Sequence, residues 1–79
     1  MIPDMEIVAL KAGNYELFPG NSLESIDLRK LHGLTVVAVK RKVEILENPG
    51  SAFVFESDDI VYVLGKPTKI AQLQHKIIH

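Results

Sequence analysis

The chain is one small domain with a nearly balanced charge. It has 79 residues, of which 9 are Lys or Arg and 10 are Asp or Glu, so the formal net charge is −1. This length leaves no room for a second domain, and this charge excludes the basic surplus that a nucleic-acid-binding domain needs. The lack of cysteine excludes a disulfide framework and a thiolate metal site. Hydrophobic residues make up 47% of the chain, which is enough for a globular core.

The sequence contains neither a targeting signal nor a membrane-spanning segment. No apolar run approaches the roughly 20 residues that cross a bilayer. The first six residues lack the basic and apolar regions of a secretory signal peptide. We therefore expect a soluble domain on the cytoplasmic side of the cell membrane, and a domain cut from a membrane protein would give the same pattern.

The N-terminal third predicts a strand, a turn and a short helix. Apolar and polar residues partly alternate over 4–10, which is typical of a strand. A turn at 11–14 leads to a short extended piece at 15–18, which Pro19-Gly20 ends. The next residues predict a helix that begins near residue 22.

The expected helix has a polar start and a glycine end. Asn21 stands at the N-cap position, and Glu24 follows it at the spacing of a capping box. Gly33 is a natural left-handed C-cap. The apolar stripe of this helix is incomplete, because it contains Leu23, Ile26 and Leu31 but leaves Leu28 outside.

The remainder predicts four closely spaced strands and a closing helix. The strands are expected at 34–39, 43–46, 53–55 and 60–64, with a tight turn at Asp58-Asp59. Pro67 fits the first position of the helix, which has Ile70, Leu73 and Ile77 on one face. The order is β-α-β-β-β-β-α. It predicts an α+β domain in which a short helix and a C-terminal helix pack on an antiparallel meander sheet.

Residue patterns that would support catalysis are missing. The sequence has no Gly-x-Ser-x-Gly elbow, no glycine-rich phosphate loop and no cysteine nucleophile. We interpret the adjacent Asp58 and Asp59 as a solvated turn, because neighbouring residues in a turn point in different directions. We expect no enzymatic activity, no metal site and no cofactor.

Two short basic segments remain as candidates for binding an anion. We interpret Lys40-Arg41-Lys42 as a solvated corner between two strands, with contact to phosphate or lipid headgroups as the alternative. Arg29-Lys30 is more informative because it lies at the end of the helix, directly before the most apolar strand. A guanidinium held there can bind a phosphate through two parallel hydrogen bonds.

Four blocks of sequence occur in the order of a known family. They are Gly20-Asn21-Ser22-Leu23, the segment 26–41, Asn48-Pro49 and the segment 59–65. Together they resemble the TrkA C-terminal domain, the C-terminal lobe of the regulator-of-potassium-conductance (RCK) module, here over residues 4–78. Lys42-Val43 and Asp58 depart from the glycines that the family carries in two turns, so we expect different turn geometry there.

The resemblance implies a regulatory role in cation transport. Such domains occur in gating rings of potassium channels, in soluble subunits of potassium uptake systems and at the cytoplasmic ends of cation/proton antiporters. They pair across a two-fold axis, and some bind cyclic di-AMP between the two copies. The implied partners are therefore a second copy of the chain, a small nucleotide and a membrane-embedded cation transporter or antiporter, in cis or as a separate subunit.

The resemblance also assigns ligand contacts, on the segment 26–30, at the start of the next strand and on a later proline. Ile26 and Leu28 would form an apolar wall for adenine, Asp27 would offer a carboxylate to the base, and Arg29 would face a phosphate. Thr35 and Val36 would line the floor and Pro49 the edge. The implied ligand site is thus Ile26, Asp27, Leu28, Arg29, Lys30, Thr35, Val36 and Pro49. A ligand with two-fold symmetry suits an isologous interface, where each half meets the same residues.

Other interpretations remain open. Ile26, Leu28 and Val36 could instead be dimer-core residues, with Arg29 paired to an acidic residue of the partner. The chain would then be a structural dimerisation module whose ligand site lies in another domain, such as a nucleotide-binding Rossmann lobe. This chain itself lacks Gly-x-Gly-x-x-Gly. A third interpretation is a regulatory domain of an unrelated transporter or transcription factor. We expect a homodimer in each case, because the apolar run 31–39 is more than one small domain would cover.

Overall fold

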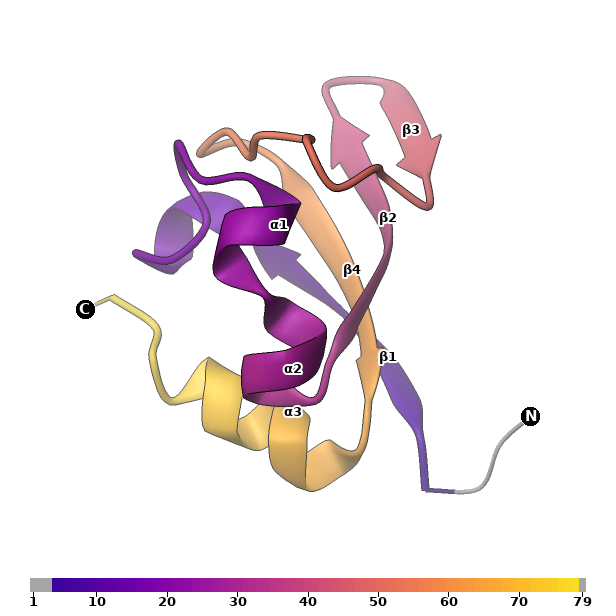
Figure 1. Ribbon diagram of the computed structural model, residues 1–79, viewed down its shortest axis with the longest axis vertical. Helices are drawn as coiled ribbons and strands as arrows, with labels where there is room; N and C mark the ends of the chain where they lie inside the picture. The colour runs from indigo at the N-terminus through magenta and orange to yellow at the C-terminus, as the bar shows by residue number, and fades with distance from the viewer. Residues whose placement is uncertain (1–3, 79) are drawn as a thin grey trace.

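The computed structural model describes residues 4–78. Residue 79 and residues 1–3, the start of the segment that lacks signal-peptide features, lie outside this range. The fold is α+β, as expected, with one antiparallel sheet and helices packed on it (Figure 1). The elements follow in the order β1 (Glu6–Lys11), the 3-10 helix η1 (Ala12–Asn14), α1 (Leu23–Ile26), α2 (Leu28–His32), β2 (Thr35–Arg41), β3 (Glu44–Glu47), β4 (Ile60–Gly65) and α3 (Pro67–Gln74).

The strand order differs from the expected meander. The sheet has four strands in the order β1-β4-β2-β3, so the last strand of the chain lies between the first and the second. Only β2 and β3 form a hairpin, in which Arg41 is opposite Glu44 and Lys42 has a φ of 57°. A positive φ at this first turn position is what a tight hairpin requires, and here a lysine adopts it without glycine. β4 lies inside the sheet, with β1 and β2 on its two sides, and its Val61 and Val63 are fully buried. β3 lies at the edge, and every one of its residues is exposed.

The strand expected at 53–55 is not part of the sheet. Within it Val54 forms an isolated bridge with Ser22. The N–H of Gly20 donates to the carbonyl of Phe55 at 2.9 Å, and the N–H of Phe55 donates to the carbonyl of Asn21 at 3.0 Å. This segment therefore runs beside the entrance to α1. The reason is packing, because the Phe55 ring turns into the core against the Phe18 ring, with 5.0 Å between centroids. The expected extended piece at 15–18 is likewise wrong, because it consists of turns apart from one bridge residue.

The expected single helix is broken into two. Asp27 separates α1 from α2 and adopts the left-handed conformation, with φ 51° and ψ 50°. The break reverses the expected stripe, since Leu28 is 2% exposed and Leu31 is 68% exposed. The N-cap is Ser22, whose hydroxyl oxygen accepts from the N–H of Ser25 at 3.1 Å. The expected C-cap is confirmed at Gly33, which has a φ of 67°.

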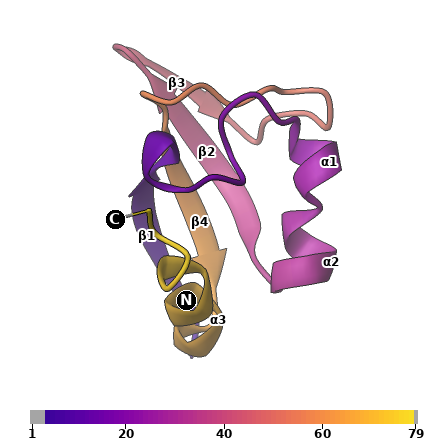
Figure 2. The same ribbon diagram turned by 90° about the vertical axis from the view of Figure 1, so that its left-hand side faces the viewer.

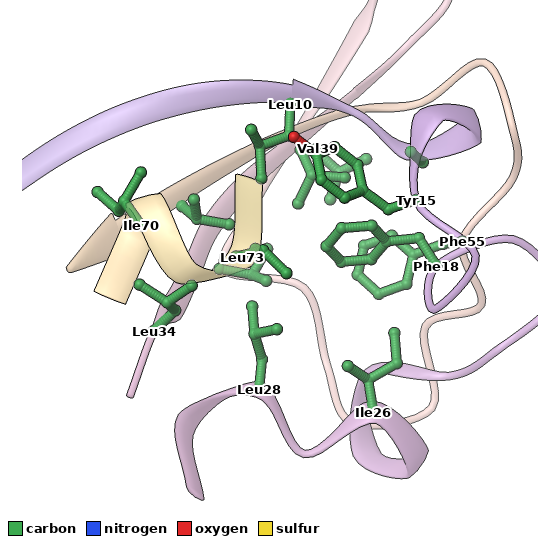
Figure 3. Packing of buried hydrophobic residues seen from close by; sticks show 14 residues of the cluster. Leu10, Tyr15, Phe18, Ile26, Leu28, Leu34, Val39, Phe55, Ile70 and Leu73 are labelled. Carbon is green, nitrogen blue, oxygen red and sulfur yellow. The ribbon is translucent and has the colours of Figure 1, made fainter. Parts of the chain in front are cut away.

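All of the helices described here cover the same face of the sheet (Figure 2). Their apolar side chains meet those of the central strands in one core (Figure 3). Ile70 and Leu73 of α3 are buried there, as expected from the sequence, and Ile77 packs at its margin. A Cβ at Gly65 would clash with the Leu34 side chain, so glycine ends β4 where the chain packs against the start of the segment that leads into β2. None of the helices formed by residues 4–78 has the length and apolar character needed to cross a bilayer.

One argument for a dimer is weakened by this core. Most of the apolar run 31–39 is already covered within a single chain, because Leu34, Val36 and Val39 are buried in the core. The large apolar side chains that remain exposed on the described residues are elsewhere, with the exception of Leu31. They are Ile7, Leu31, Val43, Ile45, Leu46, Val54 and Ile78.

Candidate ligand-binding pocket

A pocket of about 310 Å³ lies where three separate segments meet. The first segment is the broken helix, the second is the start of β2, and the third is the loop that follows β3 (Figure 1). The residues that line the pocket are Leu23, Glu24, Asp27, Leu28, Arg29, Leu34, Thr35, Val36, Asn48, Pro49 and Ser51. Apolar and polar side chains therefore share its walls, and the polar ones come from the helix, from the start of β2 and from the loop.

The helix break and the helix end form two of the walls. At Asp27 the left-handed conformation redirects the chain, so that α2 continues at an angle and brings Leu28 and Arg29 to the pocket. A short polar residue such as Asp tolerates this conformation better than most side chains. Gly33 then turns the chain directly into β2, and its N–H donates to the carbonyl of Arg29 at 3.1 Å. The start of β2 consequently lies directly beneath the helix.

The loop after β3 forms the third wall and is fixed by backbone hydrogen bonds. The N–H of Asn48 donates to the carbonyl of Val37 at 2.9 Å, which anchors the loop to β2. At its other side the N–H of Glu24 donates to the carbonyl of Ser51, also at 2.9 Å. Pro49 lies between these anchors and is buried. The loop thus bridges the sheet and the first turn of α1.

An ion pair between a half-exposed arginine and a buried aspartate holds the far end of the same loop. The Arg41 guanidinium donates from Nε and Nη2 to the two carboxylate oxygens of Asp59, at 2.8 and 2.7 Å. Asp59 is 1% exposed and also accepts from the N–H of Glu56 at 2.8 Å. The hydrogen bonds from Arg41 are the main cause that lowers the pKa of Asp59, with the backbone N–H of Glu56 contributing in the same direction against the effect of burial. The carboxylate is therefore ionised at neutral pH.

The Arg41–Asp59 pair corrects two interpretations of the sequence. Asp59 is not part of a solvated turn, although Asp58 beside it is exposed. Arg41 is not simply solvated between its neighbouring lysines, since Nη2 also donates to the carbonyl of Val54 at 2.9 Å and the guanidinium lies 4.9 Å from the centre of the Phe53 ring. The sequence separates Arg41 and Asp59 by 18 residues, so no local pattern indicates this contact.

Six of the eight residues assigned to the ligand site meet at this pocket. They are Asp27, Leu28, Arg29, Thr35, Val36 and Pro49. The other two do not line it, for opposite reasons. Ile26 is 8% exposed and belongs to the core, because it precedes the break in the helix. Lys30 is exposed outside the pocket.

Five further lining residues were not among those assigned from the sequence: Leu23, Glu24, Leu34, Asn48 and Ser51. For two of them a signal was present. Asn48 belongs to the Asn48-Pro49 block, in which the resemblance assigns only Pro49 to the ligand site, and Leu23 belongs to the apolar stripe of the helix. The contribution of Ser51 depends on the course of a loop that the sequence does not specify.

The polar residues of the pocket give it a mixed character. Glu24 and Asp27 offer carboxylates and Arg29 offers a guanidinium, and no ion pair joins Arg29 to a carboxylate within residues 4–78. Over the same residues, no cluster of three His, Cys, Asp or Glu side chains is arranged to hold a metal ion. The arrangement suits an organic ligand that carries a negative charge, hydrogen-bond donors and a flat apolar surface.

This fold, with helices on one face of the sheet, is that of an RCK_C domain, a regulatory domain of potassium transport systems. The chain belongs to the TrkA-C domain family, whose model matches residues 5–77. It is similar to the Ktr system potassium uptake protein C of Bacillus subtilis (strain 168), with 33% identity over 60 residues. That match covers 76% of this chain and 27% of the relative, so the chain spans about a quarter of the relative's length.

Solved structures share the fold. The RCK C domain of the potassium transport protein KtrA, solved in complex with cyclic di-AMP, has a TM-score of 0.83 and 28% identity, over 94% of this chain and 85% of that one. The RCK domain of GsuK has a TM-score of 0.83 at 18% identity, over 98% of this chain and 16% of that one. The RCK_C dimer of S. agalactiae BusR, in complex with cyclic di-AMP, has a TM-score of 0.78 at 19% identity, over 92% and 90%. At these last two identities the likeness concerns the fold alone.

Proposed function

We propose that the chain is a ligand-sensing regulatory domain of a bacterial potassium or cation transport protein, and that it binds cyclic di-AMP between two copies on the cytoplasmic side of the membrane. Its role is binding and not catalysis. It would report occupancy of the pocket to a membrane-embedded transporter or antiporter, attached in cis or present as a separate subunit. The domain would extend over residues 4–78.

One observation carries this proposal. Three separate segments converge on one pocket: the broken helix contributes the Asp27 carboxylate and the Arg29 guanidinium, and apolar side chains come from the helix, from β2 and from the loop after β3. The apolar residues Leu23, Val36 and Pro49 can sandwich a flat base, while the Arg29 guanidinium can bind a phosphate through two parallel bonds. Support also comes from the likeness to the KtrA domain, which was solved with cyclic di-AMP.

The size of the pocket supports a shared site. About 310 Å³ is at the lower limit of volumes that enclose a drug-sized ligand. One pocket therefore suits one half of a cyclic dinucleotide, and the two-fold symmetry of the ligand suits two equivalent pockets facing each other. Exposed Leu46 and Val54 border the loop that carries Pro49, and they offer apolar surface for the contact between copies.

Titration calorimetry with cyclic di-AMP tests the proposal directly. We expect one ligand bound for two chains. Absence of heat up to high micromolar ligand would refute the ligand assignment, and one ligand per chain would refute the shared site. Sedimentation in the presence and absence of ligand measures the mass of the complex independently.

Substitution of Arg29 tests the phosphate contact. A charge-assisted hydrogen bond contributes roughly 1.5–3 kcal/mol, and 1.4 kcal/mol is a factor of ten in affinity. Arg29→Ala should therefore weaken binding by about ten-fold or more, and Arg29→Lys should restore only part of the loss, because an ammonium cannot form the paired bonds. The matched control is Lys30→Ala, which removes a neighbouring cation that does not line the pocket. An equal effect of both alanine variants would indicate general charge attraction in place of a specific contact.

A second candidate function is a structural dimerisation module whose ligand site lies in another domain. The exposed apolar side chains of Leu46 and Val54 favour dimerisation independently of any ligand. A stable dimer that gives no heat with cyclic di-AMP would select this function over the first.

A further inference from the structure

Asn48 is the pocket residue whose chemistry the proposed function does not yet use. It lines the pocket next to Pro49, at the end of the hairpin strand β3. Its backbone is fixed, because its N–H donates to the carbonyl of Val37 at 2.9 Å. Within residues 4–78 its side-chain amide makes no hydrogen bond, whereas the amide of Asn21 donates to the carbonyl of Leu17 at 2.8 Å. Asn48 thus combines a fixed backbone with an exposed side-chain amide that is free to pair with a ligand at the wall of the pocket.

An amide matches one purine edge better than the other. Asparagine offers a donor and an acceptor side by side, and this pair is complementary to the N6 amino group and the N7 atom of adenine. Guanine presents two acceptors, O6 and N7, at the same edge, so an amide can satisfy only one of them. Discrimination of this kind is strong when it leaves a polar group of the site unpaired.

From this placement we propose that Asn48 makes the pocket select adenine over guanine by pairing with the N6 and N7 edge of the base. The inference rests on the proposed function, since it concerns the base of the same cyclic dinucleotide. It divides the pocket into parts: Arg29 binds the phosphate, the apolar residues hold the base, and Asn48 reads its edge.

A backbone explanation for Asn48 has to be separated from this one. Asn48 has a φ of 49°, and asparagine is among the few residues that adopt this conformation readily. Asn48→Gly keeps the backbone conformation and removes the amide. Asn48→Asp keeps the size and the tolerance for positive φ, but it replaces the donor with an acceptor. Only a role in reading the base predicts that Asn48→Gly loses the preference between the two bases while Asn48→Asp keeps it.

The experiment compares cyclic di-AMP with cyclic di-GMP by calorimetry on wild type, Asn48→Asp and Asn48→Gly. Gln72→Glu is the matched control, because it makes the same amide-to-acid change at an exposed position of α3 away from the pocket. Thermal unfolding of each variant checks that the fold is retained. The quantity of interest is the ratio of the two affinities, since a new negative charge weakens both phosphodiesters alike.

We expect wild type and Gln72→Glu to prefer cyclic di-AMP. Asn48→Asp should bind both ligands more weakly but keep this preference, because a carboxylate still accepts from the N6 amino group of adenine and faces only acceptors on guanine. Removal of the side chain should instead lower the preference by about ten-fold or more. Asn48→Gly should lose both affinity and preference. If wild type binds cyclic di-AMP and Asn48→Gly retains the same preference over cyclic di-GMP, the inference is overturned and the proposed function stays intact. A wild-type chain that binds neither ligand overturns both.

Discussion

The sharpest consequence of the fold for stability concerns the carboxylate of Asp59. Asp59→Asn keeps the size of the side chain but removes its charge and one of its two acceptor oxygens. In the wild type this carboxylate accepts three hydrogen bonds, two from Arg41 and one from the N–H of Glu56. An asparagine would place its NH₂ group against one of these donors, so at least one buried donor would lose its partner.

The magnitude follows from the environment of each partner. Removing one member of a fully buried ion pair costs about 3–5 kcal/mol, because the other charge stays buried without compensation. Here the Arg41 side chain is 36% exposed and keeps its contact with Glu56 at 3.0 Å, so water and Glu56 compensate part of the loss. We therefore expect the free energy of unfolding to fall by about 2–3 kcal/mol for Asp59→Asn. A domain of this length has roughly 4–12 kcal/mol in total, so the substitution should remove a sizeable fraction of its stability.

Thermal and urea unfolding monitored by circular dichroism would measure this effect. A loss of about 2–3 kcal/mol corresponds to a fall in Tm of roughly 10–20 °C for a domain of this size. Asp58→Asn is the matched control, since the neighbouring carboxylate is exposed and should change stability by less than about 0.5 kcal/mol. Equal stability of Asp59→Asn and Asp58→Asn would refute the structural role of the pair.

The pH dependence supplies a second test of the same pair. The pKa of Asp59 is lower in the folded protein than in the unfolded chain, where it is about 3.9. The stability that it contributes is therefore fully present above about pH 5 and declines as the pH falls through both values. The difference in stability between wild type and Asp59→Asn should narrow below about pH 4. A difference that does not change down to pH 2 would show that the charge of Asp59 is not its source.

Two further predictions concern the dimer and the helix break. Leu46→Glu should shift the sedimentation of the chain toward the single-chain mass without unfolding it, because this side chain is exposed. A charge at Ile26 or Val36, which are both buried, should unfold the domain instead. A dimer that persists in Leu46→Glu would contradict the assignment of Leu46 to the dimer contact. Asp27→Ala should lower the free energy of unfolding by about 1–2 kcal/mol, because alanine is strained at the positive φ of this position. Asp27→Gly should not lower it. Equal stabilities of the two variants in thermal unfolding would refute the backbone role of Asp27.

The sequence predicts those parts of the fold that depend on local patterns. The strands rich in valine, the glycine cap at residue 33 and the apolar face of the last helix all follow from periodicity and from the preferences of single residues. The position of β4 in the centre of the sheet does not follow from such patterns. It depends on which strand pairs with a neighbour along both of its edges, and packing over the whole chain decides this.

The candidate site divides along the same line. The resemblance assigned segments near Arg29, Val36 and Pro49, and the fold brings these three together. Ile26 lies in the core and not at the pocket because the helix breaks after it, and a helix pattern without proline or glycine gives no warning of a break at Asp27. Asn48 was missed because its place at the pocket depends on where the loop after β3 crosses the helix, which is fixed by hydrogen bonds to distant residues.

The break at Asp27 and the loop at Asn48 share a physical feature that connects fold to function. Four residues other than glycine have a positive φ among those described, and two of them, Asp27 and Asn48, line the pocket. Short polar side chains are the ones that tolerate this backbone, and they are also the ones that can pair with a nucleobase. The requirements of the turn and of the ligand are thus met by the same residues. Alanine at either position would confound the two, because it strains the backbone and removes the polar group together. Glycine separates them: it retains the turn and leaves the pocket without the group that would contact the ligand.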